Sequence, residues 1–141
     1  MKALLIGEYR DGKLLDNIYE LVAFAGKMGA DSAIVLIGDV SNVPRCNGTL
    51  YLADIAKYGE YNPELHKQLI LAAITKENPE YVVFSHSSYG WDLAPRVATA
   101  LKVAQVSEVV KIIDDSFEVG CCNAKMRRTV KPATSKAVVT I

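Results

Sequence analysis

The chain has too few of the residues on which small disulfide-rich and zinc-binding proteins depend. Its 141 residues include three cysteines and two histidines, and no two cysteines have the C-x-x-C spacing. Three thiols cannot build a disulfide framework or a four-thiolate zinc site, and two isolated histidines are weak evidence for metal ligands. We therefore expect a cytoplasmic protein without a metal site.

Net charge and long apolar runs are also absent. Sixteen basic residues balance sixteen acidic residues, and the sequence pI is near 6.7. This balance argues against a surface for nucleic acids or anionic membranes, which carries an excess of basic residues. The longest apolar stretches, such as Leu69–Ile74, fall far short of the ~20 residues that cross a bilayer. We expect no nucleic-acid partner and no membrane insertion.

The sequence does contain enough apolar material for one core. Half of its residues are hydrophobic, 23% are charged, and the mean hydropathy is +0.14, which excludes intrinsic disorder. Domains usually span roughly 100–200 residues. We therefore expect residues 1–141 to form a single domain.

From Ala3 to Leu101, short apolar runs alternate with stretches of helical periodicity. Buried strands are predicted at residues 3–6, 33–37, 49–53 and 81–84, and helices at residues 14–28, 62–77 and 92–101. This alternation predicts a mainly parallel sheet flanked by helices, with right-handed crossovers. The expected fold class is a three-layer, Rossmann-like α/β architecture.

After Leu101 the pattern changes to short runs rich in valine and isoleucine. They occupy residues 103–107, 109–113, 117–122, 127–130 and 137–141. No helical stretch separates them, so we expect short antiparallel strands at the carboxy-terminal edge of the sheet. The last strand, ending at Ile141, would then present an open edge. The vicinal pair Cys121-Cys122 would point to opposite faces of its strand.

Local signals predict where the helices begin and how one link is built. Asn62 followed by Pro63 is typical of a capped helix start. Asp92 is expected to cap the next helix, with Pro95 in its first turn, where no N–H is required. The link Asp39–Gly48 is too short for a full crossover, so we expect a loop or a single helical turn there.

The sequence also predicts the surroundings of three basic side chains. Arg96 lies in an early helical turn, where a cation is poorly placed for the helix dipole, so we expect a specific carboxylate or carbonyl partner for it. His66 is expected to face solvent from its helix. His86 is expected to be a loop residue with an ordinary hydrogen-bond partner.

The densest polar cluster is Ser85–Asp92, between a buried strand and a helix. Open α/β sheets place their ligands at such points. Backbone N–H groups at the helix start, together with Ser87, Ser88, Gly90 and Asp92, could receive the anionic group of a nucleotide. The same serines and aspartate could instead merely satisfy the free N–H groups of the helix. Both interpretations remain open at this point.

The sequence offers no convincing catalytic residues. Serine, histidine and aspartate do occur in the Ser85–Asp92 cluster, but neighbouring residues seldom supply the geometry of a triad, and no G-x-S-x-G motif exists. After Gly7-Glu8 the next glycine is Gly12. This segment therefore matches neither the G-x-G-x-x-G fingerprint nor a P-loop. We therefore expect neither a catalyst with its own active site nor a cofactor-binding motif.

Three stretches resemble the amino-terminal domain of the electron transfer flavoprotein alpha subunit. The strongest similarity runs from Gly90 to Val109 and includes Asp92-Leu93-Ala94-Pro95-Arg96; Leu4–Leu14 and Asn123–Ile141 match more weakly. There are departures from the family pattern. Trp91 stands where the family commonly has a basic residue, Cys121-Cys122 replaces small and aromatic residues, and the Asp39–Gly48 link is shorter than the family's helical crossover.

The resemblance implies an adenine-nucleotide-hydrolase-like fold and a role as a scaffold. In the family, an alpha–beta heterodimer carries electrons from flavin dehydrogenases to an acceptor, and it is a carrier rather than an enzyme. FAD is held mainly by a carboxy-terminal alpha domain, which we expect to be absent after Ile141, and AMP can bind in the beta subunit. We therefore expect pairing with a beta subunit and no flavin in this chain.

Two alternatives belong to other classes of protein. The chain could be a stand-alone nucleotide-binding module that uses the Gly7-Glu8 and Ser85–Asp92 loops for AMP or ATP. It could also be a structural homodimer that pairs through the edge strand expected near Ile141.

Overall fold

The computed structural model describes residues 1–141, and its centre is a six-stranded parallel sheet in the order β5-β4-β1-β6-β11-β7. Its strands are β1 (Lys2–Ile6), β4 (Asp31–Gly38), β5 (Thr49–Asp54), β6 (Tyr81–Phe84), β7 (Ala104–Val106) and β11 (Ala137–Thr140). All five strand pairs are parallel. The predicted α/β class with a parallel sheet is confirmed.

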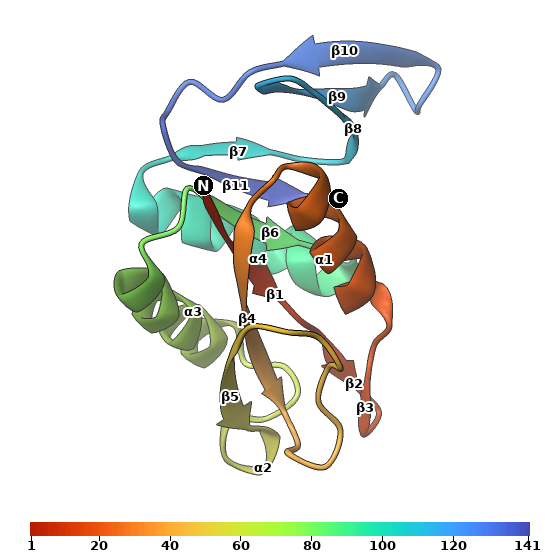
Figure 1. Cartoon of the computed structure of the whole chain (residues 1–141). Helices are drawn as coiled ribbons and strands as arrows, with labels where there is room; N and C mark the ends of the chain where they lie inside the picture. Colours follow the sequence, from red (N-terminus) through yellow and green to blue (C-terminus); the bar gives the residue numbers. More distant parts are fainter.

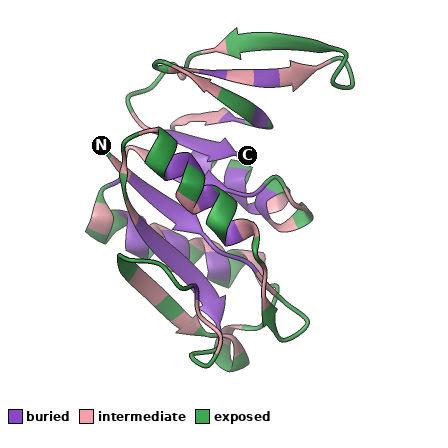
Figure 2. Cartoon of the chain, turned by 45° about the vertical axis from the view of Figure 1, so that its right-hand side comes forward, coloured by how far each residue is buried: buried purple, intermediate pink, exposed green.

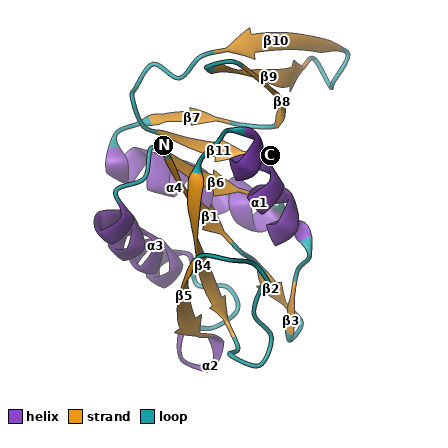
Figure 3. Ribbon diagram, viewed as in Figure 1, coloured by secondary structure: helices purple, strands orange, loops and turns teal.

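Helices cover both faces of this sheet (Figures 1 and 3). They are α1 (Asn17–Lys27), α2 (Ile55–Tyr58), α3 (Pro63–Glu77) and α4 (Ser88–Leu101). One face of β1 packs with α3 and α4, as in the cluster of Leu4, Ile70 and Val97. The other face packs with α1, as in the cluster of Leu5 and Leu21. No helix is both long enough and apolar enough to span a membrane.

Several expected helix ends are confirmed. The Asn62 side chain accepts a hydrogen bond from the Leu65 N–H, Pro63 is the first helical residue, and Asn78 ends α3 in the left-handed conformation. The helix α1 begins at Asn17 rather than at Leu14, because Leu14 belongs to a small hairpin of β2 (Tyr9–Arg10) and β3 (Lys13–Leu14) that the sequence did not predict.

The predicted arrangement of the last strands is partly wrong. Three of them, β8 (Val109–Ile113), β9 (Ser116–Cys121) and β10 (Met126–Val130), do form an antiparallel sheet at this end of the molecule. The strands β7 and β11, however, are parallel members of the main sheet, and β11 lies between β6 and β7. All four residues of β11 are buried, as in an interior parallel strand. Ile141 is therefore not beside an open edge.

Two further details correct the sequence-based predictions near α4 and the outer hairpin. The helix begins at Ser88 and is capped by Ser87, so Asp92 is not its cap and Pro95 lies inside the helix. The strand β9 ends at Cys121, and Cys122 lies in the following turn with a φ of 53°, so the two thiols do not share one strand.

The Asp39–Gly48 link is a loop, as expected. It contains one short turn, in which Asn42 N–H donates to the Asp39 carbonyl. Further along, Arg45 N–H donates to the Tyr19 hydroxyl of α1 at 3.2 Å. The loop thus passes on the α1 side of the sheet, and it connects two parallel strands without a crossover helix.

Candidate functional site at the carboxyl ends of β1 and β6

A cleft opens where the strand order of the main sheet reverses. The chain builds β4 and β5 on one side of β1 and then crosses to β6 on the other, so the ends of β1 and β6 flank the switch point at which open α/β sheets bind ligands. The cleft measures about 310 Å³. It is lined by Glu8, Tyr9, Arg10, Glu60, Tyr61, Ser88 and Tyr89.

A buried carboxyl group stands at the inner end of this cleft. Glu8 is 4% exposed, and its Oε1 accepts a 2.5 Å hydrogen bond from the Ser87 hydroxyl. Burial raises the pKa of Glu8, and the Ser87 bond and the Arg10 charge oppose this rise only in part. The Asn17 side chain lies beside the carboxyl, and Glu8 Oε2 and Asn17 Oδ1 are both buried acceptors without a partner.

Three of the four residues expected to bind an anion, Ser87, Ser88 and Gly90, lie at one helix start, and each already has a role within the chain. The Ser87 hydroxyl accepts from Gly90 N–H at 3.1 Å while donating to Glu8. A Cβ on Gly90 would lie 2.0 Å from the Ser85 carbonyl oxygen, so only glycine fits this close approach. Ser88 accepts from Arg10 at 3.2 Å.

Asp92 belongs to a separate ionic network one turn along α4. Arg96 donates from Nε to Asp92 Oδ2 at 3.1 Å and from Nη1 to Glu64 Oε1 at 3.3 Å, and the Tyr61 hydroxyl donates to Asp92 at 2.6 Å. These bonds tie the starts of α3 and α4 together beside the cleft. The expectation of a carboxylate partner for Arg96 is confirmed.

A histidine–tyrosine pair lies beneath the cleft, and sequence reasoning missed it. His66 is 1% exposed, with Nε2 3.0 Å from the Gly59 carbonyl and Nδ1 2.9 Å from the Tyr89 hydroxyl. Because a carbonyl can only accept, Nε2 carries the proton and Nδ1 accepts from Tyr89. Burial lowers the pKa of His66 and raises that of Tyr89.

The expectation of a solvent-facing His66 is therefore wrong. His66 precedes Ile70 by four residues and Ile74 by eight, and both isoleucines are buried. Helical spacing thus places the histidine on the buried stripe of α3. This was the signal that could have identified it.

The two histidines near the cleft are hydrogen-bonded to groups other than serines. His86 is a loop residue with an ordinary partner, as expected, because its Nδ1 lies 2.8 Å from the Thr140 hydroxyl. No histidine is hydrogen-bonded to a serine or a cysteine, and the nearest serine to a carboxylate, Ser87, is the helix cap. What the cleft can do is hold a small polar group beside tyrosine rings.

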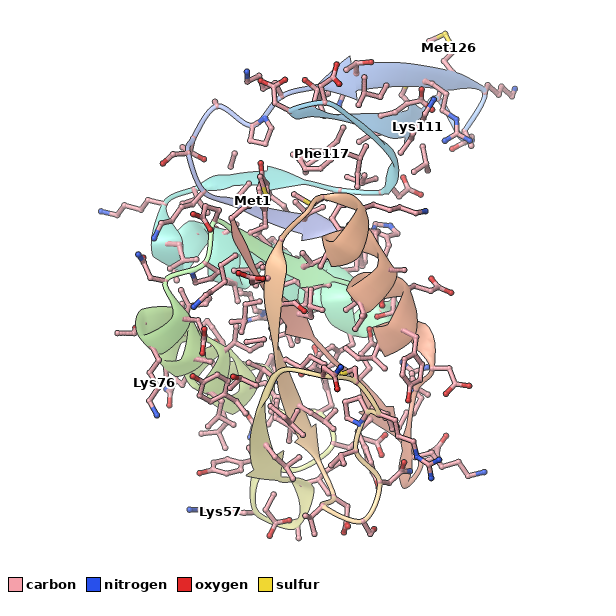
Figure 4. All side chains as sticks on the ribbon, in the orientation of Figure 1. Met1, Lys57, Lys76, Lys111, Phe117 and Met126 are labelled. Atoms are coloured by element: carbon pink, nitrogen blue, oxygen red, sulfur yellow. The ribbon has the colours of Figure 1, made fainter.

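A second surface lies at the opposite end of the chain, on the outer antiparallel sheet. Phe117 of β9 anchors this sheet to the body, with its ring centroid 6.1 Å from that of Phe24 and 5.8 Å from that of Tyr81. Figure 4 shows Phe117 pointing toward the main sheet and Met126 pointing away from it. A groove of about 710 Å³ separates α1 from β8, and six of its ten lining residues are apolar.

Much of this sheet is solvent-exposed, above all the strand β10 (Figure 2). Residues 126–129 of β10 are all exposed, and Val110 of β8 and Met126 of β10 are 52% and 57% exposed. The outward edge of β10 has no strand partner. Exposed apolar side chains beside a large groove are typical of a surface that another protein covers.

Comparison with known proteins gives one family. Residues 4–141 match the electron transfer flavoprotein domain family. The chain is 29% identical over 121 residues to the electron transfer flavoprotein subunit alpha of Bacillus subtilis, which covers 79% of this chain and 37% of that protein. It is 28% identical over 149 residues to the subunit alpha of Pseudomonas aeruginosa, covering 100% of this chain and 48% of that protein.

A similar match links the chain to the electron transfer flavoprotein subunit alpha of Bradyrhizobium diazoefficiens, at 28% identity over all of this chain and 47% of that protein. The chain thus spans less than half the length of these curated relatives. Since the family match extends over nearly all of its residues, the chain belongs to the electron transfer flavoprotein domain family.

Proposed function

We propose that this chain is the scaffold domain of an electron transfer flavoprotein of the alpha-subunit type, and that it docks onto a beta subunit. The observation that carries the proposal is the outer sheet, where exposed Val110 lines the groove against α1 and Met126 is exposed on β10. The family match and the alpha-subunit relatives support the same role. Residues 1–141 then act as one domain of a cytoplasmic heterodimer.

The residues of this chain do not fit FAD at the switch-point cleft. A pyrophosphate group needs N–H donors and cations where it binds. Here the Ser87 hydroxyl already accepts from the Gly90 N–H, Arg10 is bonded to Ser88, and the buried Glu8 carboxyl lies at the same helix start. We therefore place the flavin of the complete carrier outside this chain, and AMP, where present, in the beta subunit.

In this role the chain is a carrier component rather than an enzyme. Electrons would pass from flavin dehydrogenases to an acceptor through the complete complex, and this domain would hold the subunits in place. The match to the electron transfer flavoprotein family supports that division of labour.

Co-expression with a cognate beta subunit tests the proposal. We expect the two chains to co-elute on size exclusion, and Val110→Asp in β8 to abolish co-elution because it places a charge on the docking surface. Val40→Asp is the matched control, since Val40 is 78% exposed on the Asp39–Gly48 loop. Failure of the unaltered chain to bind, or equal loss with both variants, contradicts the proposal.

The nucleotide-binding module is the second candidate, because the cleft lies at the switch point and Arg10 and Ser88 flank its mouth. The buried Glu8 carboxyl opposes it. Calorimetry with AMP and ATP separates the two candidates: heat of binding that disappears in Arg10→Ala would favour the module, whereas the scaffold role predicts no heat.

A further inference from the structure

The free strand edges of the two larger sheets are not protected alike. The edge strand β7 is only three residues long, β8 carries Lys111 and an irregular register after Val109, and β10 carries Arg127 and Arg128. Short length and charged side chains are the usual means by which proteins keep a free edge from pairing. The edge strand β5 is longer and almost uncharged: its six residues read Thr-Leu-Tyr-Leu-Ala-Asp, and the one carboxylate, at its end, caps α2.

The outward edge of β5 is open along its length. The strand pairs only with β4, and no backbone hydrogen bond from residues 49–54 runs to any element outside the sheet. Figure 1 shows β5 as the last strand on its side of the sheet. Its N–H and C=O groups on that side therefore form an unfilled template for another strand.

An apolar groove accompanies this edge. It lies between β5 and α3, measures about 400 Å³, and eight of its nine lining residues are hydrophobic. On the strand itself, Leu52 is 37% exposed. The open hydrogen-bonding groups and the apolar surface thus occur together, as they do where an added strand extends a sheet.

We propose that β5 pairs antiparallel with β5 of a second copy of this chain, across a two-fold axis through Tyr51, which joins the two main sheets. In this register Leu50 faces the second copy's Leu52, Thr49 faces its Ala53, and Asp54 faces its Gly48. The leucines of the two copies meet, and no like charges stand opposite each other. A register centred on Leu52 would instead set Leu50 against the Asp54 carboxylate.

The surroundings of Tyr51 also suit a self-pairing edge. Lys76 Nζ lies 5.7 Å from the Tyr51 ring, and the Tyr51 hydroxyl donates to Glu77 at 2.5 Å. Glu77 also pairs with Lys2 at 2.9 Å, so each copy brings charges of both signs near the axis. Such self-complementarity is what a two-fold interface requires. This pairing goes beyond docking onto a beta subunit and uses a different surface.

Sedimentation velocity tests the proposal on the intact chain. Over a roughly hundredfold range of concentration we expect the mass to rise from 15.4 kDa toward twice that value. Leu52→Lys places a charge on the edge and should raise the dissociation constant at least about tenfold. Met126→Lys on the protected β10 edge is the matched control and should dimerise like the unaltered chain. A mass that stays at 15.4 kDa, or loss with Met126→Lys alone, overturns the proposal.

Cross-linking tests the register independently of any loss of folding. Opposite residues of an antiparallel pair have Cα atoms about 4.5–5.5 Å apart, within the roughly 4.4–6.8 Å that a disulfide spans. In oxidised glutathione, Tyr51→Cys should yield a dimer joined by a disulfide between the two introduced thiols, which mass spectrometry detects. Leu52→Cys keeps the same native thiols and should link far less. Equal linkage of both variants, or none in either, overturns the two-fold pairing at Tyr51.

Discussion

The main sheet and the outer sheet use β-strands for opposite purposes. In the main sheet, β1 and β11 are buried on both faces, whereas in the outer sheet β10 is exposed at four of its five residues. The outer sheet is fixed to the body mainly through one face, by Phe117 and Val119. Burial on both faces builds the scaffold, and burial on one face leaves a surface free for another protein.

Removing the Phe117 ring, which packs the outer sheet against the body, should cause the largest loss of stability. Phe117→Ala deletes a fully buried ring that contacts Phe24 and Tyr81, and we expect it to lower the free energy of unfolding by about 3–5 kcal/mol. Met126→Ala, at an exposed position of β10 in the same sheet, should change it by less than about 0.5 kcal/mol. Denaturant unfolding measures both; equal losses would mean that the outer sheet is buried on both sides.

The pH dependence of stability should have opposite signs for a buried carboxyl beside the main sheet and for an ion-paired carboxyl in the outer sheet. The raised pKa of Glu8 means that its protonated form stabilises the fold at low pH and that this stability is lost as the pH rises through the raised pKa. Glu8→Gln should therefore be more stable than the unaltered chain at pH 8, by about 1 kcal/mol or more, because it also offers an N–H to Asn17 Oδ1.

The outer sheet supplies the matched control for that experiment. The bond from Lys131 holds the pKa of Asp115 below its ordinary value, so this carboxylate stabilises the fold above its ordinary pKa and ceases to do so as the pH falls. Asp115→Asn should thus lose stability slightly at neutral pH and not in acid. Parallel pH profiles for the two variants would contradict the assigned environments.

The cap of α4 should have an intermediate effect. Ser87→Ala removes the acceptor of Gly90 N–H and the donor to Glu8, and we expect a loss of about 1 kcal/mol in thermal unfolding. Asp92→Ala breaks only exposed pairs with Arg96 and Tyr61, so its loss should be smaller and should shrink further in high salt. A larger loss for Asp92→Ala would restore the aspartate as the helix cap.

The smallest effect is expected at the tip of the outer hairpin. Cys122, Asn123 and Ala124 all have φ between 53° and 60°, a conformation that costs alanine about 1–2 kcal/mol. Glycine relieves that strain but loses more entropy on folding. Ala124→Gly should therefore raise the free energy of unfolding by about 0.5 kcal/mol, and an unchanged or lower value would show that the turn relaxes in solution.

Local signals in the sequence predicted most of the fold, because they depend on residues close together along the chain. The alternation of strands and helices and the capped start of α3 at Asn62 are of this kind. The position of β11 is not a local property, since the sequence Ala137–Thr140 does not indicate that β6 and β7 are its neighbours. A run of four buried residues fits either an edge strand or an interior strand.

The candidate site was predictable only in outline. The polar cluster after β6 indicated the right end of the sheet, but the bond between Glu8 and Ser87 joins residues 79 positions apart. A carboxyl group occupying the expected anion site follows from the pairing of β1 with β6, which no local pattern contains. His66 differs, because its helical spacing already placed it on the buried face.

The position of β11 also limits how much of the main sheet can fold while the chain is being synthesised. The strand β7 has β11 as its sole neighbour in the main sheet, so it has no partner until Ala137–Thr140 leave the exit tunnel. Until then β7 lies beside an incomplete main sheet without a strand partner. Nascent chains should therefore recruit chaperones until that last strand is inserted.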